Sequence, residues 1–167
     1  TQENVVADGK EHNYDRLIIA TGAKPFIPPI PGAENALTYK DVLDLKNIPE
    51  NLNIVGSGVI ACEFAGIFSW LGSNVNILCR RQFLRNLDDE IKEYVLKNLL
   101  NGVNVHENVK VNEITRENII TSNGKMRGLS FLATGMTPNT EIIKDMVKLG
   151  YKGYIEVNGQ MQTSNSS

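Results

Sequence analysis

The sequence predicts an α/β fold in which helices pack on a parallel sheet and an antiparallel β-meander follows. A short apolar strand, a glycine-rich turn and an apolar helix occupy residues 52–71, and another strand follows at 75–79. This order is a βαβ unit, whose strands must be parallel. Several short strand-like runs then fill residues 103–132. With 167 residues, 41% of them hydrophobic, the chain has the size and composition of one globular domain.

Charge and cysteine content exclude several classes of protein. The 17 basic and 19 acidic side chains leave a formal charge of −2, so no nucleic-acid partner is expected. No apolar run reaches the roughly 18 residues of a membrane helix and no secretory leader opens the chain, so we expect no membrane partner and a cytoplasmic location. Cys62 and Cys79 are too few for a disulfide framework. His12 and His106 lack neighbours at ligand spacing, so no metal site is expected.

The first 31 residues are predicted to form a hairpin and an extended connector. Residues 3–21 have the pattern of two strands around an Asp8-Gly9 turn, the second being 17–20. Four of the six prolines fall within 25–31, where they fix φ and remove backbone donors. We therefore expect one domain boundary here, with residues 1–31 before it and residues 32–167 after it.

A capped helix is predicted next. Thr38 is followed three residues later by Asp41, which resembles a capping box for a helix ending at Leu45. The helix of the βαβ unit, 59–71, is apolar on all sides. We therefore expect it to be buried between two layers, with Phe68 and Trp70 in the core.

The second half of the chain is predicted to contain one helix and the meander. Three acidic residues, 88–90, suit the positive end of a helix dipole, so a helix is expected from 88 to 100. Asn123-Gly124 is the strongest short hairpin signal in the chain. We expect the short strands of 103–132 to form an antiparallel meander.

One short pattern occurs twice. Residues 20–25 and 133–138 both have the form ATGxxP, and each follows an apolar run. Glycine can adopt unusual φ values and proline prevents a return to helix. The repeat predicts that the chain leaves a sheet twice by the same kind of turn.

The glycine-rich turn predicts a dinucleotide site. In Gly56-Ser57-Gly58, the first glycine permits the tight turn and the second lets the backbone approach a pyrophosphate. Ala61 is small enough for close packing of the helix on the strand. The start of the helix offers free N–H groups to the anion. The alternative is a tight turn without a ligand.

The end of the next strand indicates which dinucleotide is bound. NADH sites place an acid about 20 residues after the glycines, where it bonds the ribose 2′-hydroxyl. This chain has Arg80 and Arg81 there instead, with Arg85 four residues on. Guanidinium groups can grip a 2′-phosphate, so NADPH is favoured over NADH. The alternative is a solvated basic face.

Glu63 is the one charged residue between Leu52 and Arg80. On so apolar a helix, a carboxylate is expected to lie beside the cofactor or to pair with a cation of another domain. The alternative is an ordinary exposed glutamate.

The ordered set of segments resembles one family. The segments are YDRLIIATGAKP, the proline-rich connector, NIVGSGVIACEFAGIFSWLGS, the arginine cluster, LRNLDDEI and LATGMTPN. Together they are similar to the flavin-dependent pyridine nucleotide-disulfide oxidoreductases, most of all to the glutathione reductase, dihydrolipoamide dehydrogenase and mercuric reductase branches. The resemblance covers nearly the whole chain. It implies a Rossmann-like NAD(P)H-binding domain inserted into an FAD domain, of which residues 1–31 are a remnant and the last residues a returning strand.

The resemblance also implies residue roles. Gly56, Ser57, Gly58, Val59 and Ile60 would line the pyrophosphate and nicotinamide path. Thr134 and Gly135 would close that path. Glu63 would point toward the flavin and pair with a lysine of the FAD domain, Arg80 and Arg85 would bind the 2′-phosphate, and Cys79 replaces the glutamate of NADH-using relatives.

Departures and absent segments limit what this chain is expected to do. Val59 replaces a gating tyrosine, and Met136 replaces an arginine that would add a phosphate contact. FAD binding, the redox-active cysteine pair and the homodimerisation domain are expected on other segments. The chain is therefore expected to bind and orient NADPH for hydride transfer to FAD in the full-length reductase, and to be inactive alone. A stand-alone NAD(P)H-binding regulatory module and an S-adenosylmethionine-dependent methyltransferase are the alternatives, although the latter usually has an acid where Arg80 stands.

Overall fold

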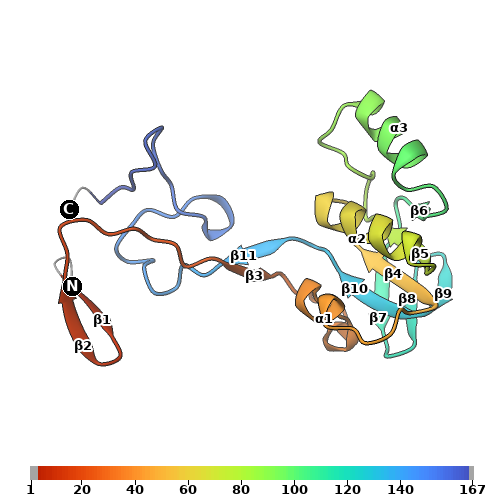
Figure 1. The fold of residues 1–167 in the computed structure, drawn as a ribbon, viewed down its shortest axis with the longest axis horizontal. Coiled ribbons are helices and arrows are strands. Elements are labelled where there is room, and N and C mark those ends of the chain that lie inside the picture. Colours follow the sequence, from red (N-terminus) through yellow and green to blue (C-terminus); the bar gives the residue numbers. More distant parts are fainter. Residues whose placement is uncertain (1–3, 166–167) are drawn as a thin grey trace. The chain divides into compact units, whose positions relative to one another are not determined.

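A computed structural model describes residues 4–165 (Figure 1). Its contacts divide the chain into two compact units. One consists of residues up to Lys24 together with those from Met136 onward, and the other of Pro25–Gly135. The prolines of the predicted connector thus fall at the start of the second unit.

The first unit contains a hairpin and a short paired segment. Strands β1 (Asn4–Ala7) and β2 (Lys10–Asn13) are antiparallel, and β3 (Ala23–Pro25) pairs with β11 (Met136–Pro138). A 3₁₀ turn, η2 (Tyr151–Gly153), follows. The Asp8-Gly9 turn is confirmed, with positive φ at both residues. Residue 3, where the hairpin was expected to begin, lies outside the described residues.

The strand predicted at 17–20 is wrong. No described residue pairs with this segment as a strand, and the second strand of the hairpin is β2 instead. Ile18 is 89% exposed. A strand needs a neighbour that accepts its ladder hydrogen bonds, and apolar composition does not provide one.

The two ATGxxP segments pair with each other. Phe26 donates its N–H to the Gly135 carbonyl at 2.9 Å, and Asn139 donates to the Gly22 carbonyl at 2.9 Å. Residue 26 is bonded to 135 and residue 22 to 139, so the two neighbouring strands β3 and β11 run in opposite directions. Gly22 and Gly135 have φ of 69° and 109°, as the repeat predicted. Only the second copy follows a strand.

The second unit is built on a four-stranded parallel sheet. The sheet has the order β10-β4-β5-β6, formed by β10 (Leu129–Leu132), β4 (Asn51–Val55), β5 (Asn74–Leu78) and β6 (Asn104–His106). Helix α2 (Val59–Trp70) connects β4 to β5, which confirms the βαβ unit. Helix α3 (Asp89–Asn98) precedes β6, and Asp88 is its N-cap residue.

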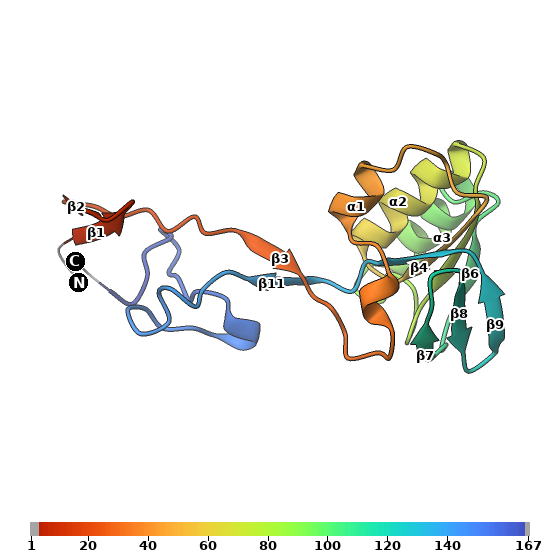
Figure 2. The same cartoon turned by 90° about the horizontal axis from the view of Figure 1, so that it is seen from below.

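Helices and meander cover opposite faces of this sheet (Figure 2). The meander consists of β7 (Val111–Ile114), β8 (Asn118–Thr121) and β9 (Gly124–Arg127), all antiparallel. The predicted meander is therefore confirmed for these three strands but wrong for β6 and β10. These two strands pair in parallel with β5 and β4. Residues 79–103 connect β5 to β6, and residues 107–128, which include the meander, connect β6 to β10; crossovers of this length permit parallel pairing.

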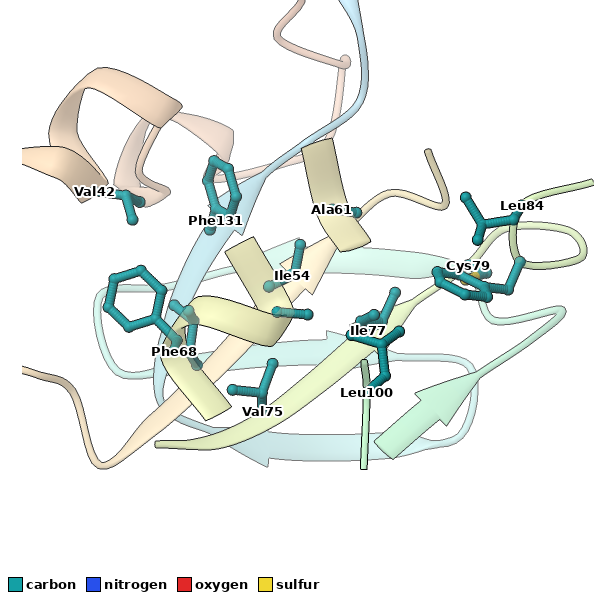
Figure 3. Packing of buried hydrophobic residues seen from close by; sticks show 13 residues of the cluster. Val42, Ile54, Ala61, Phe68, Val75, Ile77, Cys79, Leu84, Leu100 and Phe131 are labelled. Atoms are coloured by element: carbon teal, nitrogen blue, oxygen red, sulfur yellow. The ribbon is translucent and has the colours of Figure 1, made fainter. Parts of the chain in front are cut away.

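Side chains alternate between two hydrophobic clusters across the sheet. Leu52 and Ile54 of β4 belong to the cluster that includes α2 residues, and Figure 3 shows Ile54 on the helix side of the sheet. Val55 and Leu78 belong to the cluster under the meander. The period of two in a strand produces this division.

Helix α2 is not buried on all sides, contrary to expectation. Ala61, Ala65 and Phe68 face the core, whereas Trp70 is 94% exposed. Phe68 is thus placed as predicted and Trp70 is not. Val59 and Ile67 of the same helix are also exposed, so α2 presents an apolar side that the described residues do not bury.

The short helix α1 (Tyr39–Leu43) has the predicted capping box. The Thr38 N–H and hydroxyl both donate to the Asp41 carboxylate, at 2.7 and 2.6 Å. These bonds hold the pKa of Asp41 below its ordinary value. A 3₁₀ turn, η1 (Ala33–Asn35), lies just before it.

A ladder of polar side chains crosses the sheet, and no sequence pattern predicted it. The Asn76 amide donates to the Asn53 carboxamide oxygen at 3.1 Å, and both residues are buried. His106 lies 3.2 Å from the Asn76 oxygen through Nε2. Such bonds between neighbouring strands fix their register.

Candidate functional site

The turn between β4 and α2 requires glycine at its first position. Gly56 has φ of 150°, and a Cβ added there would lie 2.2 Å from the Ala133 carbonyl oxygen. The Gly56 N–H donates to the Leu78 carbonyl at 3.1 Å. Gly56 therefore allows β10, β4 and β5 to end close together at one edge of the sheet.

The second glycine leaves open space at the start of α2. A Cβ added at Gly58 would meet no atom within 4 Å, and no side chain caps this end of the helix. The first-turn N–H groups, including those of Val59 and Ile60, have no partner within the helix. Ala61 is fully buried against the sheet. Backbone donors and open space fit the pyrophosphate of a dinucleotide.

The turn lies where the strand order of the sheet reverses. From β4 the chain proceeds to β5 and β6 on one side, and β10 later joins the other side of β4. The carboxyl ends of β4 and β10 flank the turn at this position. In open α/β sheets such a switch point is the usual ligand crevice.

The structure brings residues 80–85, here called the arginine loop, to the turn. The Leu84 N–H donates to the Ser57 carbonyl at 2.9 Å. Phe83 and Leu84 are buried, beside Cys79 in the helix-side cluster (Figure 3).

The predicted arginines precede and follow this buried pair in sequence. Arg80, Arg81 and Arg85 are all exposed. None of the ion pairs found among residues 4–165 includes an arginine. Their guanidinium groups are therefore available to an anion. Exposure of this kind is equally compatible with the alternative, a solvated basic face.

Thr134 and Gly135 follow β10 at the same edge. The Thr134 hydroxyl donates to the Phe26 carbonyl at 2.7 Å, so its proton is used in a bond to the proline-rich connector, residues 25–31. The Ala133 N–H donates to Val55 at 2.9 Å, which extends the sheet to this point. A Cβ on Gly135 would meet nothing within 4 Å. Of this pair, Gly135 leaves the more open approach.

Glu63 lies on the outer side of α2 and is exposed. It makes no ion pair with any residue of 4–165. Val59 and Ile67, on the same helix, are 60% and 51% exposed. The Glu63 carboxylate therefore lies on an apolar surface. The cation with which it was expected to pair is not among residues 4–165.

Neither cysteine is an activated thiol. Burial raises the pKa of Cys79 to about 12, and the charge of Glu107 adds to the rise. Its Sγ lies 3.7 Å from the Gly56 carbonyl oxygen. Burial and Glu63 also raise the pKa of Cys62. Both cysteines serve as packing groups.

Sequence reasoning missed two features of the site. One is the buried pair Phe83-Leu84, for which the apolar interruption of an arginine-rich run is a usable signal. The other is Glu107, whose carboxylate accepts the Phe83 N–H at 2.7 Å. No sequence motif predicts this bond, because it joins a backbone amide to a side chain 24 positions away.

A metal-binding cluster and a membrane-spanning helix are both absent from the described part of the chain. No group of three or more His, Cys, Asp or Glu residues in it could hold a metal ion. No helix in residues 4–165 is long and apolar enough to cross a membrane.

A parallel sheet with a glycine-rich turn at its switch point defines a Rossmann-like α/β domain of the FAD/NAD(P)-binding class. A model of the pyridine nucleotide-disulphide oxidoreductase family matches residues 1–167, and the chain belongs to this family of oxidoreductases. Its members are flavoproteins that use FAD and NAD(P)H.

Individual relatives agree with this assignment. The chain is 38% identical to the chloroplastic/mitochondrial glutathione reductase of Pisum sativum, over 96% of this chain and 31% of the relative. It is 33% identical to the mercuric reductase of Staphylococcus aureus, over 98% and 33%. The HOCl-induced flavoprotein disulfide reductase RclA from Escherichia coli superimposes with a TM-score of 0.87 at 25% identity, over 98% of this chain and 41% of that one. The chain thus spans about a third of the length of these curated relatives.

Proposed function

We propose that residues 25–135 bind NADPH, in preference to NADH, within a flavin-dependent disulfide reductase. The observation that carries the proposal is the hydrogen bond from Leu84 to the Ser57 carbonyl, 2.9 Å long. It ties the arginine loop to the turn that offers the free helix N–H groups. Pyrophosphate and 2′-phosphate of one nucleotide can then be bound by neighbouring segments.

The contribution of each residue follows from its place. Backbone N–H groups at Gly58, Val59 and Ile60 hold the pyrophosphate, and the open flank of Gly58 lets it approach. The guanidinium groups of Arg80, Arg81 and Arg85 hold the 2′-phosphate. Gly135 leaves room for the nicotinamide half of the ligand. A bound nicotinamide supplies a hydride, and these residues orient it.

The hydride acceptor is proposed to be an FAD held by the remainder of the polypeptide. Residues up to Lys24 and from Met136 onward are proposed to belong to that FAD domain. Glu63 and the exposed apolar side of α2 are proposed to face it, since a carboxylate on an apolar surface calls for a cationic partner. The complete protein is proposed to be a homodimeric disulfide reductase, and this chain alone is proposed to be inactive.

A calorimetric titration of the purified protein tests the proposal. NADPH should bind more tightly than NADH, and FAD and S-adenosylmethionine should bind negligibly. Equal affinities for the two nicotinamide nucleotides would remove the basis for the cofactor preference. Binding of S-adenosylmethionine instead would support the methyltransferase alternative.

A further inference from the structure

Two other segments, residues 107–109 and the Gly56-Ser57-Gly58 turn, hold the arginine loop in place. Backbone bonds anchor its first part: Asn108 donates to the Arg81 carbonyl at 3.4 Å, and Val109 donates to the Cys79 carbonyl at 2.9 Å. Leu84 donates to Ser57, as described above. The remaining bond runs from the Phe83 N–H to a side chain, the Glu107 carboxylate, at 2.7 Å.

The middle of the loop depends on this carboxylate. Phe83 is 2% exposed, so its N–H has little access to water and needs a protein acceptor. Leu84 has φ of 45°, a conformation that a leucine adopts only when its surroundings hold it there. A bond to a charged acceptor is stronger than a neutral one, which suits a strained position.

The loop geometry sets where the arginines point. Phe83 and Leu84 are fixed inside the helix-side cluster, and Arg81 and Arg85 flank them on the exposed side. If the buried pair shifted, both guanidinium groups would move with it. Arg80 precedes the loop directly after Cys79, which the sheet itself fixes.

We propose that Glu107 is a positioning residue for cofactor selection, which holds the arginine loop in the conformation that binds the 2′-phosphate. Glu107 touches neither the phosphate nor the nicotinamide in this role. The inference rests on the proposed NADPH function. Because an amide oxygen can also accept the Phe83 N–H, glutamine at this position keeps the role and alanine does not.

Binding constants of three variants test the inference. Glu107→Ala should weaken NADPH by about tenfold, the loss expected for one hydrogen bond to a charged group, and leave NADH unchanged. Glu107→Gln should restore most of the NADPH affinity. Glu113→Ala, which removes another exposed carboxylate nearby in sequence, is the matched control and should have no effect. If Glu107→Ala leaves the ratio of NADPH affinity to NADH affinity unchanged, the inference is overturned, provided that the unmodified protein prefers NADPH.

Amide exchange without any nucleotide separates this inference from the proposed function. The Phe83 N–H should exchange slowly in the unmodified protein and in Glu107→Gln, and faster in Glu107→Ala. A Phe83 amide equally protected in all three would refute the positioning role. If the unmodified protein shows no NADPH preference but Phe83 exchange changes as expected, the cofactor assignment fails and the loop contact stands.

Discussion

Alanine substitutions at the two glycines of the turn should affect different properties. Gly58→Ala should weaken nucleotide binding, and Gly56→Ala should lower the unfolding free energy. At Gly58 an added Cβ meets no atom within 4 Å, so the folded protein can accept it. Alanine is a poorer N-cap residue than glycine, which limits the expected loss in unfolding free energy to about 1 kcal/mol. The same methyl group occupies the space through which the pyrophosphate approaches. Gly58→Ala should therefore weaken NADPH and NADH alike, by about tenfold or more, equivalent to about 1.4 kcal/mol.

Gly56→Ala provides the contrast. Its Cβ would lie 2.2 Å from the Ala133 carbonyl oxygen, far inside the 3.0 Å that real Cβ contacts respect. Relieving this overlap moves β10 away from β4, at a cost of about 1 to 3 kcal/mol in unfolding free energy. Chemical denaturation and calorimetric titration of both variants give the two quantities. Unchanged affinity of Gly58→Ala for both nucleotides would refute a pyrophosphate site at this turn.

Three more predictions concern residues around the site. Arg80→Glu should weaken NADPH more than NADH in titrations, and parallel losses would show that Arg80 does not bind the 2′-phosphate. The pKa of Cys79 is raised from 9.0 to about 12, so the folded state holds this proton more tightly; the resulting stability is complete below pH 9 and is lost as pH rises toward 12. Native Cys79 should accordingly resist iodoacetamide at pH 8, and rapid labelling would contradict its burial. Asn76→Ala should lower the unfolding free energy by about 1 to 3 kcal/mol, because Asn53 and His106 lose a buried partner; an unchanged denaturation midpoint would contradict the ladder.

Local patterns predicted the central part of the fold. The apolar strand, Gly56-Ser57-Gly58 and the following helix identify a βαβ unit because each signal is complete within a few residues. The capping box at Thr38 is likewise a local interaction. Pairings between distant segments could not be derived in this way. The strands β6 and β10 look like meander strands in sequence, and only the return of the chain to the sheet reveals them as parallel.

The sequence also did not determine which apolar residues are exposed. Trp70 and the segment 17–20 have the composition of buried elements, yet both are exposed in the described structure. Apolar composition states what a residue would gain from burial, and the presence of a covering layer depends on the other segments of the protein.

For the candidate site, the residue types were easier to predict than the hydrogen bonds that hold those residues in place. The glycines and arginines could be named because dinucleotide chemistry requires those types at that spacing. Their arrangement depends on Leu84 and Glu107, which act through backbone N–H groups and leave no motif.

A crystal structure of the protein with NADPH would show directly where the nucleotide binds. We expect the pyrophosphate within hydrogen-bonding distance of the N–H groups of Val59 and Ile60, and the 2′-phosphate among Arg80, Arg81 and Arg85. A nucleotide bound elsewhere, with the turn empty and the three arginines in solvent, would contradict it.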